Sequence, residues 1–163
     1  SHSADMNMSA LISELERDEG VRLSAYRCTA GFLTIGVGRN LDTNKLTADE
    51  LAFVGHDGRK KPITKSQSDY LLKNDIEKVC AELLKFLPWW AYLGDVRKRV
   101  LVNMAFNLGI AGLLKFTNTL ALIRSGSYAQ AASEMVKSKW AKQVGKRADR
   151  LANMMKTGEV ADG

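Results

Sequence analysis

The sequence predicts an α+β fold that is mostly helical, with a small lobe containing a β-hairpin and a larger helical lobe joined by a long helix. Three observations predict it. Residues 21–40 show the alternation and the glycines of two hairpin strands. Residues 65–86 begin with a helix-capping signal and end before Pro88. Most of the chain beyond that proline has helical spacing of its apolar residues.

The length of the chain suits a single domain with two lobes. It has 163 residues, and we expect one domain over 1–163. The small lobe should span about 20–63, and the helical lobe about 1–19 plus 64–163. A cleft between the two lobes is the expected ligand site, because ligand sites are concave and few in each protein.

The first helix is expected from about Met8 to Glu19. Leu11 and Leu15 recur at helical spacing, and Ser9 is a candidate N-cap. Gly20 follows where a helix often ends in a left-handed glycine.

The hairpin is expected within residues 21–40, with its turn at 29–31. Side chains alternate along a strand, so one face of the second strand should be a small apolar core. That face holds Leu33, Ile35 and Val37. Gly36 and Gly38 lie on the opposite face, where a ligand is expected to approach the backbone.

The remaining segments are predicted to be helical. A short helix is expected near 47–54, and Thr64 with Gln67 has capping-box spacing at the start of the long helix from about Lys65 to Phe86. The stretch Val96 to Leu108 is apolar nearly all round, which predicts a buried central helix. Further helices are expected at 117–124, 128–137 and about 145–156.

The composition is that of a soluble globular protein with a basic surface. Hydrophobic residues make up 45% and charged residues 26%, and the net charge is +6. Such a charge favours polyanions: nucleic acid, anionic membranes or the bacterial envelope. Two cysteines and two histidines, Cys28, Cys80, His2 and His56, suggest neither a disulfide framework nor a zinc site. We expect no metal or cofactor, no stable membrane insertion and a monomer.

Glu19 is the candidate general acid. It ends the first helix, where the negative end of the helix dipole disfavours a negatively charged side chain. A carboxylic acid that stays protonated near neutrality suits acid catalysis. The alternative is a solvated surface glutamate, since the surrounding segment is ELERDEG.

Cys28 and Thr34 extend this candidate site. Taken singly, the cysteine suits a small buried residue and the threonine a strand former. Eight residues separate Glu19 from Cys28, and five separate Cys28 from Thr34. With this spacing the sequence resembles the phage-type lysozymes, glycoside hydrolase family 24. Their signature is a glutamate, eight residues, an aspartate or cysteine, five residues and a threonine. The resemblance resumes at VLVNMAFNLG, KFTNTL, SKW, KRADR and KTGE.

The resemblance implies an endolysin, made in the host bacterial cytoplasm, that acts on peptidoglycan in the periplasm or envelope and lyses the cell. The reaction would be hydrolysis of the β-1,4 bond between N-acetylmuramic acid and N-acetylglucosamine. Glu19 would protonate the leaving oxygen. Cys28 stands where relatives have an aspartate, and an unperturbed thiol is mostly neutral at pH 7. Our hypothesis is that Cys28 and Thr34 position the attacking water; as a thiolate, the cysteine could also act as a base or attack the sugar.

Further positions carry over from the resemblance. Arg147 matches an arginine that pairs with the catalytic glutamate across the cleft. Arg39 and Asp75 match a pair that ties the small lobe to the long helix, so we predict an ion pair there. Pattern alone allows core packing for Phe106 and a solvated face for Arg147. The expected substrate-binding residues are Asn40, Phe106, Asn107, Thr119, Glu134 and Arg147.

Three other functions remain open from the sequence. A lytic transglycosylase needs a catalytic acid but no second carboxylate. A non-catalytic peptidoglycan-binding protein would hold glycans without cutting them. A nucleic-acid binder is suggested by charge alone, and because no helix combines basic residues with a reading motif, we expect no nucleic acid partner.

Overall fold

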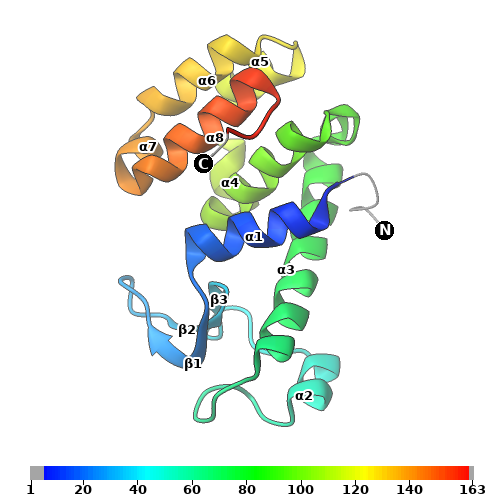
Figure 1. Ribbon diagram of the computed structural model, residues 1–163, viewed down its shortest axis with the longest axis vertical. Helices are drawn as coiled ribbons and strands as arrows, with labels where there is room; N and C mark the ends of the chain where they lie inside the picture. Colours follow the sequence, from blue (N-terminus) through cyan, green and yellow to red (C-terminus); the bar gives the residue numbers. More distant parts are fainter. Residues whose placement is uncertain (1–5, 162–163) are drawn as a thin grey trace. The chain divides into compact units, whose positions relative to one another are not determined.

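The computed structural model describes residues 6–161 and confirms the α+β class, with long stretches of helix and one small antiparallel sheet (Figure 1). His2 lies outside the described residues. In chain order the elements are α1 (Met8–Glu19), β1 (Arg22–Arg27), β2 (Leu33–Gly36), β3 (Arg39–Asn40), α2 (Ala48–Val54), α3 (Lys65–Phe86), the 3-10 helix η1 (Pro88–Tyr92), α4 (Asp95–Leu114), α5 (Thr117–Arg124), α6 (Tyr128–Lys137), α7 (Lys139–Val144) and α8 (Lys146–Thr157).

The chain divides into two compact units. The sheet unit is Ser9–Lys78, and the helical unit is Ser1–Met8 together with Val79–Gly163. The division differs from the expected lobes, because α1 and the first part of α3 belong with the sheet. The expected cleft between lobes stays a prediction.

In the sheet unit, three antiparallel strands lie in the order β1-β2-β3. Tyr26 pairs with Thr34, Thr34 with Asn40, and the register shifts between Arg22 and Tyr26. The expected apolar face is confirmed, since Ile35 is fully buried. The core of the unit is formed by Ile35, Leu41, Leu46, Val54, Ile63 and Leu71.

The helices of the sheet unit begin and end as their local sequence dictates. The N–H of Thr64 donates to Gln67 Oε1 over 2.9 Å, and the N–H of Gln67 donates to Thr64 Oγ1 over 3.1 Å, which confirms the capping box. The same reciprocal cap joins Thr47 and Glu50 at α2. Ser9 lies inside α1 rather than before it, so its expected role as N-cap is wrong.

The bare face expected beside the glycines of the hairpin is filled by protein. A Cβ atom on Gly36 would lie 3.2 Å from Ser68 Oγ, and Gly36 is buried. A Cβ atom on Gly38 would lie 3.3 Å from a carboxylate oxygen of Glu19. The expectation that a ligand approaches the backbone is therefore wrong at Gly36, whose free space is taken by the Ser68 hydroxyl.

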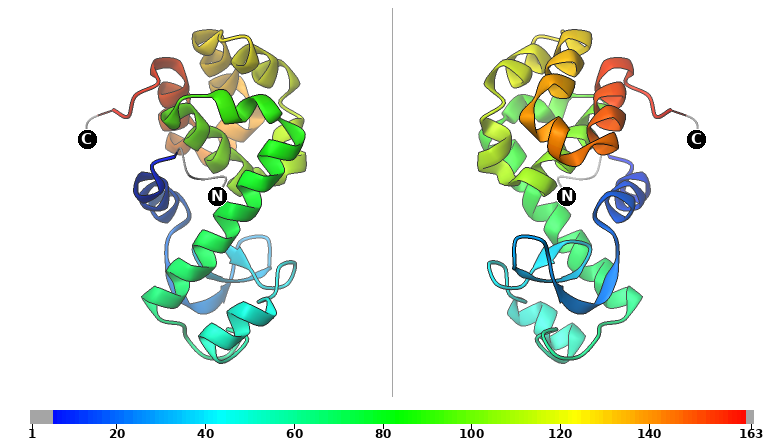
Figure 2. Two further views of the ribbon diagram at one scale, coloured as in Figure 1. Left: turned by 90° about the vertical axis from the view of Figure 1, so that its right-hand side faces the viewer. Right: turned by 90° about the vertical axis from the view of Figure 1, so that its left-hand side faces the viewer.

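In the helical unit, α5, α6 and α8 lie side by side, and α7 leads from α6 into α8 (Figures 1 and 2). The expected central helix is present as α4 and is buried along Val100–Ala105. It extends beyond Leu108 across a break at Gly109. The φ of Gly109 is 73°, which lies outside the range of a right-handed helix. Among residues 6–161 no single helix is long and apolar enough to cross a membrane; α4 and α5 qualify only as a pair bent by 106°.

Arg97 ties α4 to the end of α8. Its Nε donates to the carbonyl of Met155 over 2.7 Å, and its Nη2 donates to that of Lys156 over 3.1 Å. The guanidinium also lies 3.6 Å from the centre of the Tyr128 ring. These bonds satisfy carbonyl groups that the last turn of a helix leaves without intrahelical partners.

Candidate active site

Glu19 is placed by the end of α1. The next residue, Gly20, has a φ of 78° and turns the chain directly into β1. The Glu19 side chain is half-buried and lies against Gly38, where any Cβ atom would crowd its carboxylate. The glycine after β2 therefore makes room for the candidate acid.

Thr34 lies in the middle of the sheet, between Tyr26 on β1 and Asn40 on β3. Its side chain is only 5% exposed, and its hydroxyl donates to the carbonyl of Phe32 over 3.0 Å. A hydroxyl has one proton, so the oxygen of Thr34 keeps lone pairs that can accept a further hydrogen bond.

Cys28 lies at the base of the hairpin turn. Its N–H donates to the carbonyl of Phe32 over 2.9 Å, and the N–H of Gly31 donates to its carbonyl over 2.8 Å. The thiol is half-buried and lies within reach of Thr34. The structure thus brings together the cysteine and the threonine that spacing had placed on one face.

The surroundings of Cys28 favour the thiolate. The pKa of the thiol is lowered chiefly by the backbone N–H of Phe32, and further by those of Ala30 and Gly31. Burial opposes these bonds but does not outweigh them. The sequence alone implied an unperturbed thiol, and the turn lowers its pKa.

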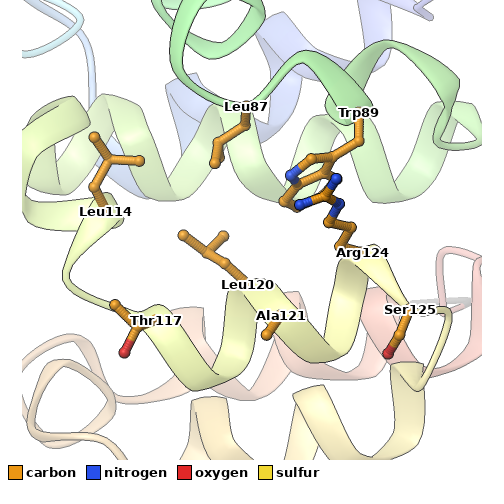
Figure 3. A pocket seen from close by; sticks show the side chains of 8 residues that line it. All are labelled: Leu87, Trp89, Leu114, Thr117, Leu120, Ala121, Arg124 and Ser125. Atoms are coloured by element: carbon orange, nitrogen blue, oxygen red, sulfur yellow. The ribbon is translucent and has the colours of Figure 1, made fainter.

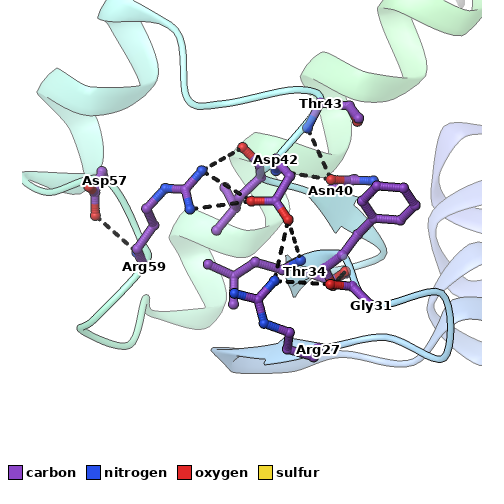
Figure 4. Close-up of polar contacts among 11 residues, drawn as sticks. Arg27, Gly31, Thr34, Asn40, Asp42, Thr43, Asp57 and Arg59 are labelled. Carbon is purple, nitrogen blue, oxygen red and sulfur yellow. Dashed lines mark hydrogen bonds and ion pairs between the residues drawn. The ribbon is translucent and has the colours of Figure 1, made fainter.

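A cluster of polar contacts around Asp42 fastens the same turn (Figure 4). Asp42 Oδ2 accepts from the N–H of Leu33 over 2.9 Å. Arg27 Nη1 donates to the carbonyl of Gly31 over 2.9 Å and lies 3.6 Å from Asp42 Oδ2. Arg59 Nη1 lies 3.3 Å from Asp42 Oδ1. The N–H of Leu33, and then Arg59, hold the pKa of Asp42 below its ordinary value.

Asn40 uses its side-chain oxygen within the chain. Asn40 Oδ1 accepts from the N–H of Asp42 over 2.9 Å and from that of Thr43 over 3.1 Å. This turn starts the loop that carries Asp42 back to the hairpin. The role of Asn40 in substrate binding stays a prediction.

The predicted ion pair between Arg39 and Asp75 is confirmed, with Arg39 Nη1 3.2 Å from Asp75 Oδ1. The sequence reasoning missed the nearer partner: Arg39 Nη2 lies 2.6 Å from Glu50 Oε1. Asn74 also donates to Glu50, over 2.9 Å. Glu50 is part of the Thr47 capping box, which predicts the start of α2 but not the contact with Arg39.

The two carboxyl groups around Arg39 titrate differently. Burial raises the pKa of Asp75 to about 6, since the attraction of Arg39 is offset by the neighbouring charge of Glu50. Burial acts the same way on Glu50, but hydrogen bonds from Arg39, Asn74 and the N–H of Thr47 lower its pKa to about 2. Glu50 is therefore the permanent partner of Arg39.

The other expected site residues lie in the helical unit, on four helices. Asn107 is exposed on α4, and its Oδ1 accepts from Trp140 Nε1 over 2.7 Å. Arg147 is buried on α8, and its Nε donates to Asn103 Oδ1 over 2.9 Å. Of the remaining three, Glu134 is exposed, Phe106 is half-buried and Thr119 is buried.

Comparison with known proteins decides the family. The phage lysozyme family model matches residues 16–156. The chain belongs to the phage lysozyme family. It is 31% identical to "Probable T4-type lysozyme 1" of Dictyostelium discoideum, over 94% of this chain and 97% of that protein. It is 30% identical to "Endolysin" of Acyrthosiphon pisum secondary endosymbiont phage 1, over 82% and 80% respectively.

A further relative is the "Pre-baseplate central spike protein Gp5" of Enterobacteria phage T4, 30% identical over 94% of this chain but 28% of that protein. The resemblance stated from the motifs is therefore confirmed, and with it a glycoside hydrolase of the lysozyme type that acts on the bacterial cell wall. The separate roles of Glu19, Cys28 and Thr34 stay predictions.

This lysozyme also has a groove in its helical unit (Figure 3). The groove has a volume of about 560 Å³, and none of the expected site residues lines it. Its lining is formed by Leu87, Trp89, Leu114, Thr117, Leu120, Ala121, Arg124 and Ser125. Within residues 6–161, no three histidine, cysteine or acidic side chains gather in a way that would hold a metal ion.

Proposed function

We propose that this lysozyme hydrolyses the β-1,4 bond between N-acetylmuramic acid and N-acetylglucosamine in bacterial peptidoglycan. Glu19 is the general acid, and Cys28 with Thr34 positions and activates the attacking water. The observation that carries the proposal is the hairpin, which gathers a thiol of lowered pKa and a threonine oxygen in the same unit as the Glu19 carboxyl.

In the proposed reaction Glu19 transfers its proton to the glycosidic oxygen as the bond from that oxygen to the sugar carbon breaks. Positive charge then develops on the sugar ring. A water molecule supplies the new C–O bond and loses one proton to the Cys28 thiolate. The Thr34 hydroxyl donates to Phe32, so its oxygen accepts a hydrogen bond from that water and fixes its direction.

The substrate-binding part of the proposal rests on the family resemblance and on side-chain exposure. Asn107 is exposed, and Trp140 holds its amide in one orientation. Arg147 is buried, and Asn103 orients its guanidinium. The proposed sugar-contacting residues are Asn40, Phe106, Asn107, Thr119, Glu134 and Arg147.

The proposed setting is that of an endolysin, made in the cytoplasm of a host bacterium and acting on peptidoglycan in the envelope. Support comes from the similarity to a phage endolysin and from the net charge of +6, which suits the carboxylates and phosphates of a bacterial envelope.

The test is mass spectrometry of the fragments released from purified peptidoglycan by the protein and by Glu19→Gln. We expect reducing muramic acid ends that have gained water, and none with the variant. Glu16→Gln, on the same helix and bonded to Lys65, is the matched control and should retain activity. Anhydro ends would identify a lytic transglycosylase, and the absence of any fragment would identify a binding protein; either result overturns the proposal.

A further inference from the structure

Asp42 is a residue that neither the motif spacing nor the family signature singles out. It lies in the loop after β3, yet its carboxylate contacts both sides of the hairpin turn. One oxygen accepts from the N–H of Leu33, the first residue of β2. The same oxygen lies 3.6 Å from Arg27, the last residue of β1.

Arg27 completes this link across the turn. Its Nη1 donates to the carbonyl of Gly31 over 2.9 Å. Because Arg27 and Leu33 are paired in register, the contacts of Asp42 close a ring around the five residues between them. Those five residues are Cys28 and the turn that follows it.

The second oxygen of Asp42 is held from another direction. Arg59 Nη1 and Nη2 donate to Asp42 Oδ1 over 3.3 and 3.4 Å, and Nη2 also donates to the carbonyl of Leu41 over 3.1 Å. Asn40 accepts from the N–H of Asp42. The carboxylate is thus also held by Arg59, from the loop that follows α2, on the side away from the hairpin contacts.

The position of the turn matters because its backbone N–H groups act on the Cys28 sulfur. A backbone N–H group cannot change its direction by adopting another rotamer, as a side-chain donor can. Its hydrogen bond to the sulfur therefore depends on the conformation of the turn. A hydrogen bond to the charged form of an acid favours that form and weakens steeply when its geometry is lost.

We infer that Asp42 is a positioning residue for the proposed reaction: by bonding Leu33 and Arg27, it holds the hairpin turn so that its N–H groups face the sulfur of Cys28. The inference rests on the proposed role of Cys28, but it concerns the state of the thiol. It can therefore be tested without reference to catalysis.

The test is the pH dependence of Cys28 alkylation by iodoacetamide, followed by peptide mass spectrometry. Cys80 is fully buried and is resolved from Cys28 as a separate peptide. We expect Asp42→Ala to raise the thiol pKa, so that alkylation at pH 6.5 slows by about three- to tenfold because the thiolate fraction falls. Asp42→Asn keeps an oxygen for the N–H of Leu33 but loses the ion pairs. Its alkylation rate should therefore lie between those of the unaltered protein and Asp42→Ala.

The sign of the shift separates positioning from a simple charge effect. If Asp42 acted only as a nearby negative charge, its removal would favour the thiolate, and the pKa of Cys28 would fall. Freeing Arg27 and Arg59 would act in the same direction. An unchanged or lowered thiol pKa in the folded Asp42→Ala protein overturns the inference; if that variant does not fold, Asp42→Asn decides by the same criterion.

Asp57→Ala is the matched control. Asp57 is exposed and accepts from the N–H of Arg59 over 3.0 Å, so the control perturbs the loop that carries Arg59 and removes a carboxylate that bonds within that loop. It should alkylate like the unaltered protein. We also expect Asp42→Ala to lower kcat while KM stays unchanged. If Cys28→Ala keeps full activity but Asp42→Ala still raises the thiol pKa, the catalytic role of Cys28 fails and the positioning role of Asp42 stands.

Discussion

At the scale of single residues, the fold alters the chemistry of two side chains that the sequence presents as ordinary. Cys28 lies in a turn whose N–H groups stabilise negative charge on sulfur. Asp75 is buried beside Arg39, whose charge is already paired with Glu50. Burial raises the pKa of Asp75, and the repulsion from Glu50 offsets much of the attraction to Arg39. The Cys28 shift comes from the turn that directly follows it, whereas the Asp75 shift involves Arg39 and Glu50 from distant segments.

Replacing Cys28 tests its proposed role as a base. We expect Cys28→Ala to lower kcat by about 10²-fold, the usual contribution of a general base. Cys28→Asp should retain activity, because a carboxylate can accept the same backbone N–H groups. Its ionisation at lower pH should move the acidic limb of the pH–rate profile downward. Thr29→Ala, at an exposed neighbouring position, is the control, and an active Cys28→Ala would contradict the role.

Asp75 predicts how stability depends on pH. Its pKa is about 6 in the folded protein and about 3.9 in an unfolded chain, so the folded state binds the proton more tightly. Its contribution is favourable at low pH and is lost as pH rises through about 6. The free energy of unfolding of Asp75→Asn, relative to the unaltered protein, should therefore increase by about 2 kcal/mol between pH 4 and pH 8.

Urea unfolding at the two pH values measures this difference. Glu50 shifts in the opposite sense: its contribution begins to fall below its ordinary pKa of about 4.3 and is lost as pH falls through about 2, so most of it remains at pH 4. A difference between the two proteins that does not change with pH would mean that Asp75 is an ordinary paired carboxylate.

At the scale of elements, helix ends were the most predictable features. α1, α3, α5 and α6 have the expected bounds, because glycines, prolines and capping boxes act over a few residues. The short elements were missed. η1 and α7 have five and six residues, too few for a periodic pattern to be recognised.

The bond from Arg97 to the end of α8 predicts a cost in stability. Arg97→Ala removes two hydrogen bonds to the carbonyls of Met155 and Lys156 and the contact with the Tyr128 ring. We expect the free energy of unfolding to fall by about 2 kcal/mol. The measurement is thermal denaturation of Arg97→Ala, with Lys142→Ala, at an exposed position on α7, as the control. If the two variants were equally stable, Arg97 would not stabilise the end of α8.

At the scale of the whole molecule, the family and the fold class were predictable because the motifs occur in order along most of the chain. The site was predictable only in part. Residue spacing identified Cys28 and Thr34, but it did not show that the backbone N–H groups of the turn between them lower the pKa of the thiol. Neither Asp42 nor Glu50 has a local pattern that points to the hairpin or to Arg39, because a contact between distant segments leaves no periodic trace in a single sequence.

The net charge of +6 predicts that retention on the cell wall depends on salt. Glu19→Gln should co-sediment with purified peptidoglycan at low ionic strength and be progressively released as sodium chloride increases, since screening weakens exposed charges. The contributing exposed or half-buried lysines and arginines of the C-terminal third are Lys137, Lys139, Lys142, Lys146, Arg150 and Lys156. Binding that salt does not change would assign retention to sugar contacts alone.

The hairpin turn has a consequence for how this lysozyme tolerates evolutionary change. The groups that act on the Cys28 sulfur are mostly main-chain N–H groups, which every amino acid except proline supplies. Sequence drift at Ala30 and Phe32 should therefore leave the sulfur chemistry nearly intact, while a proline at either position removes a donor. Relatives could diverge at these two positions and still inherit the same local electrostatics, whereas Gly31, with a φ of 86°, is restricted by its backbone conformation.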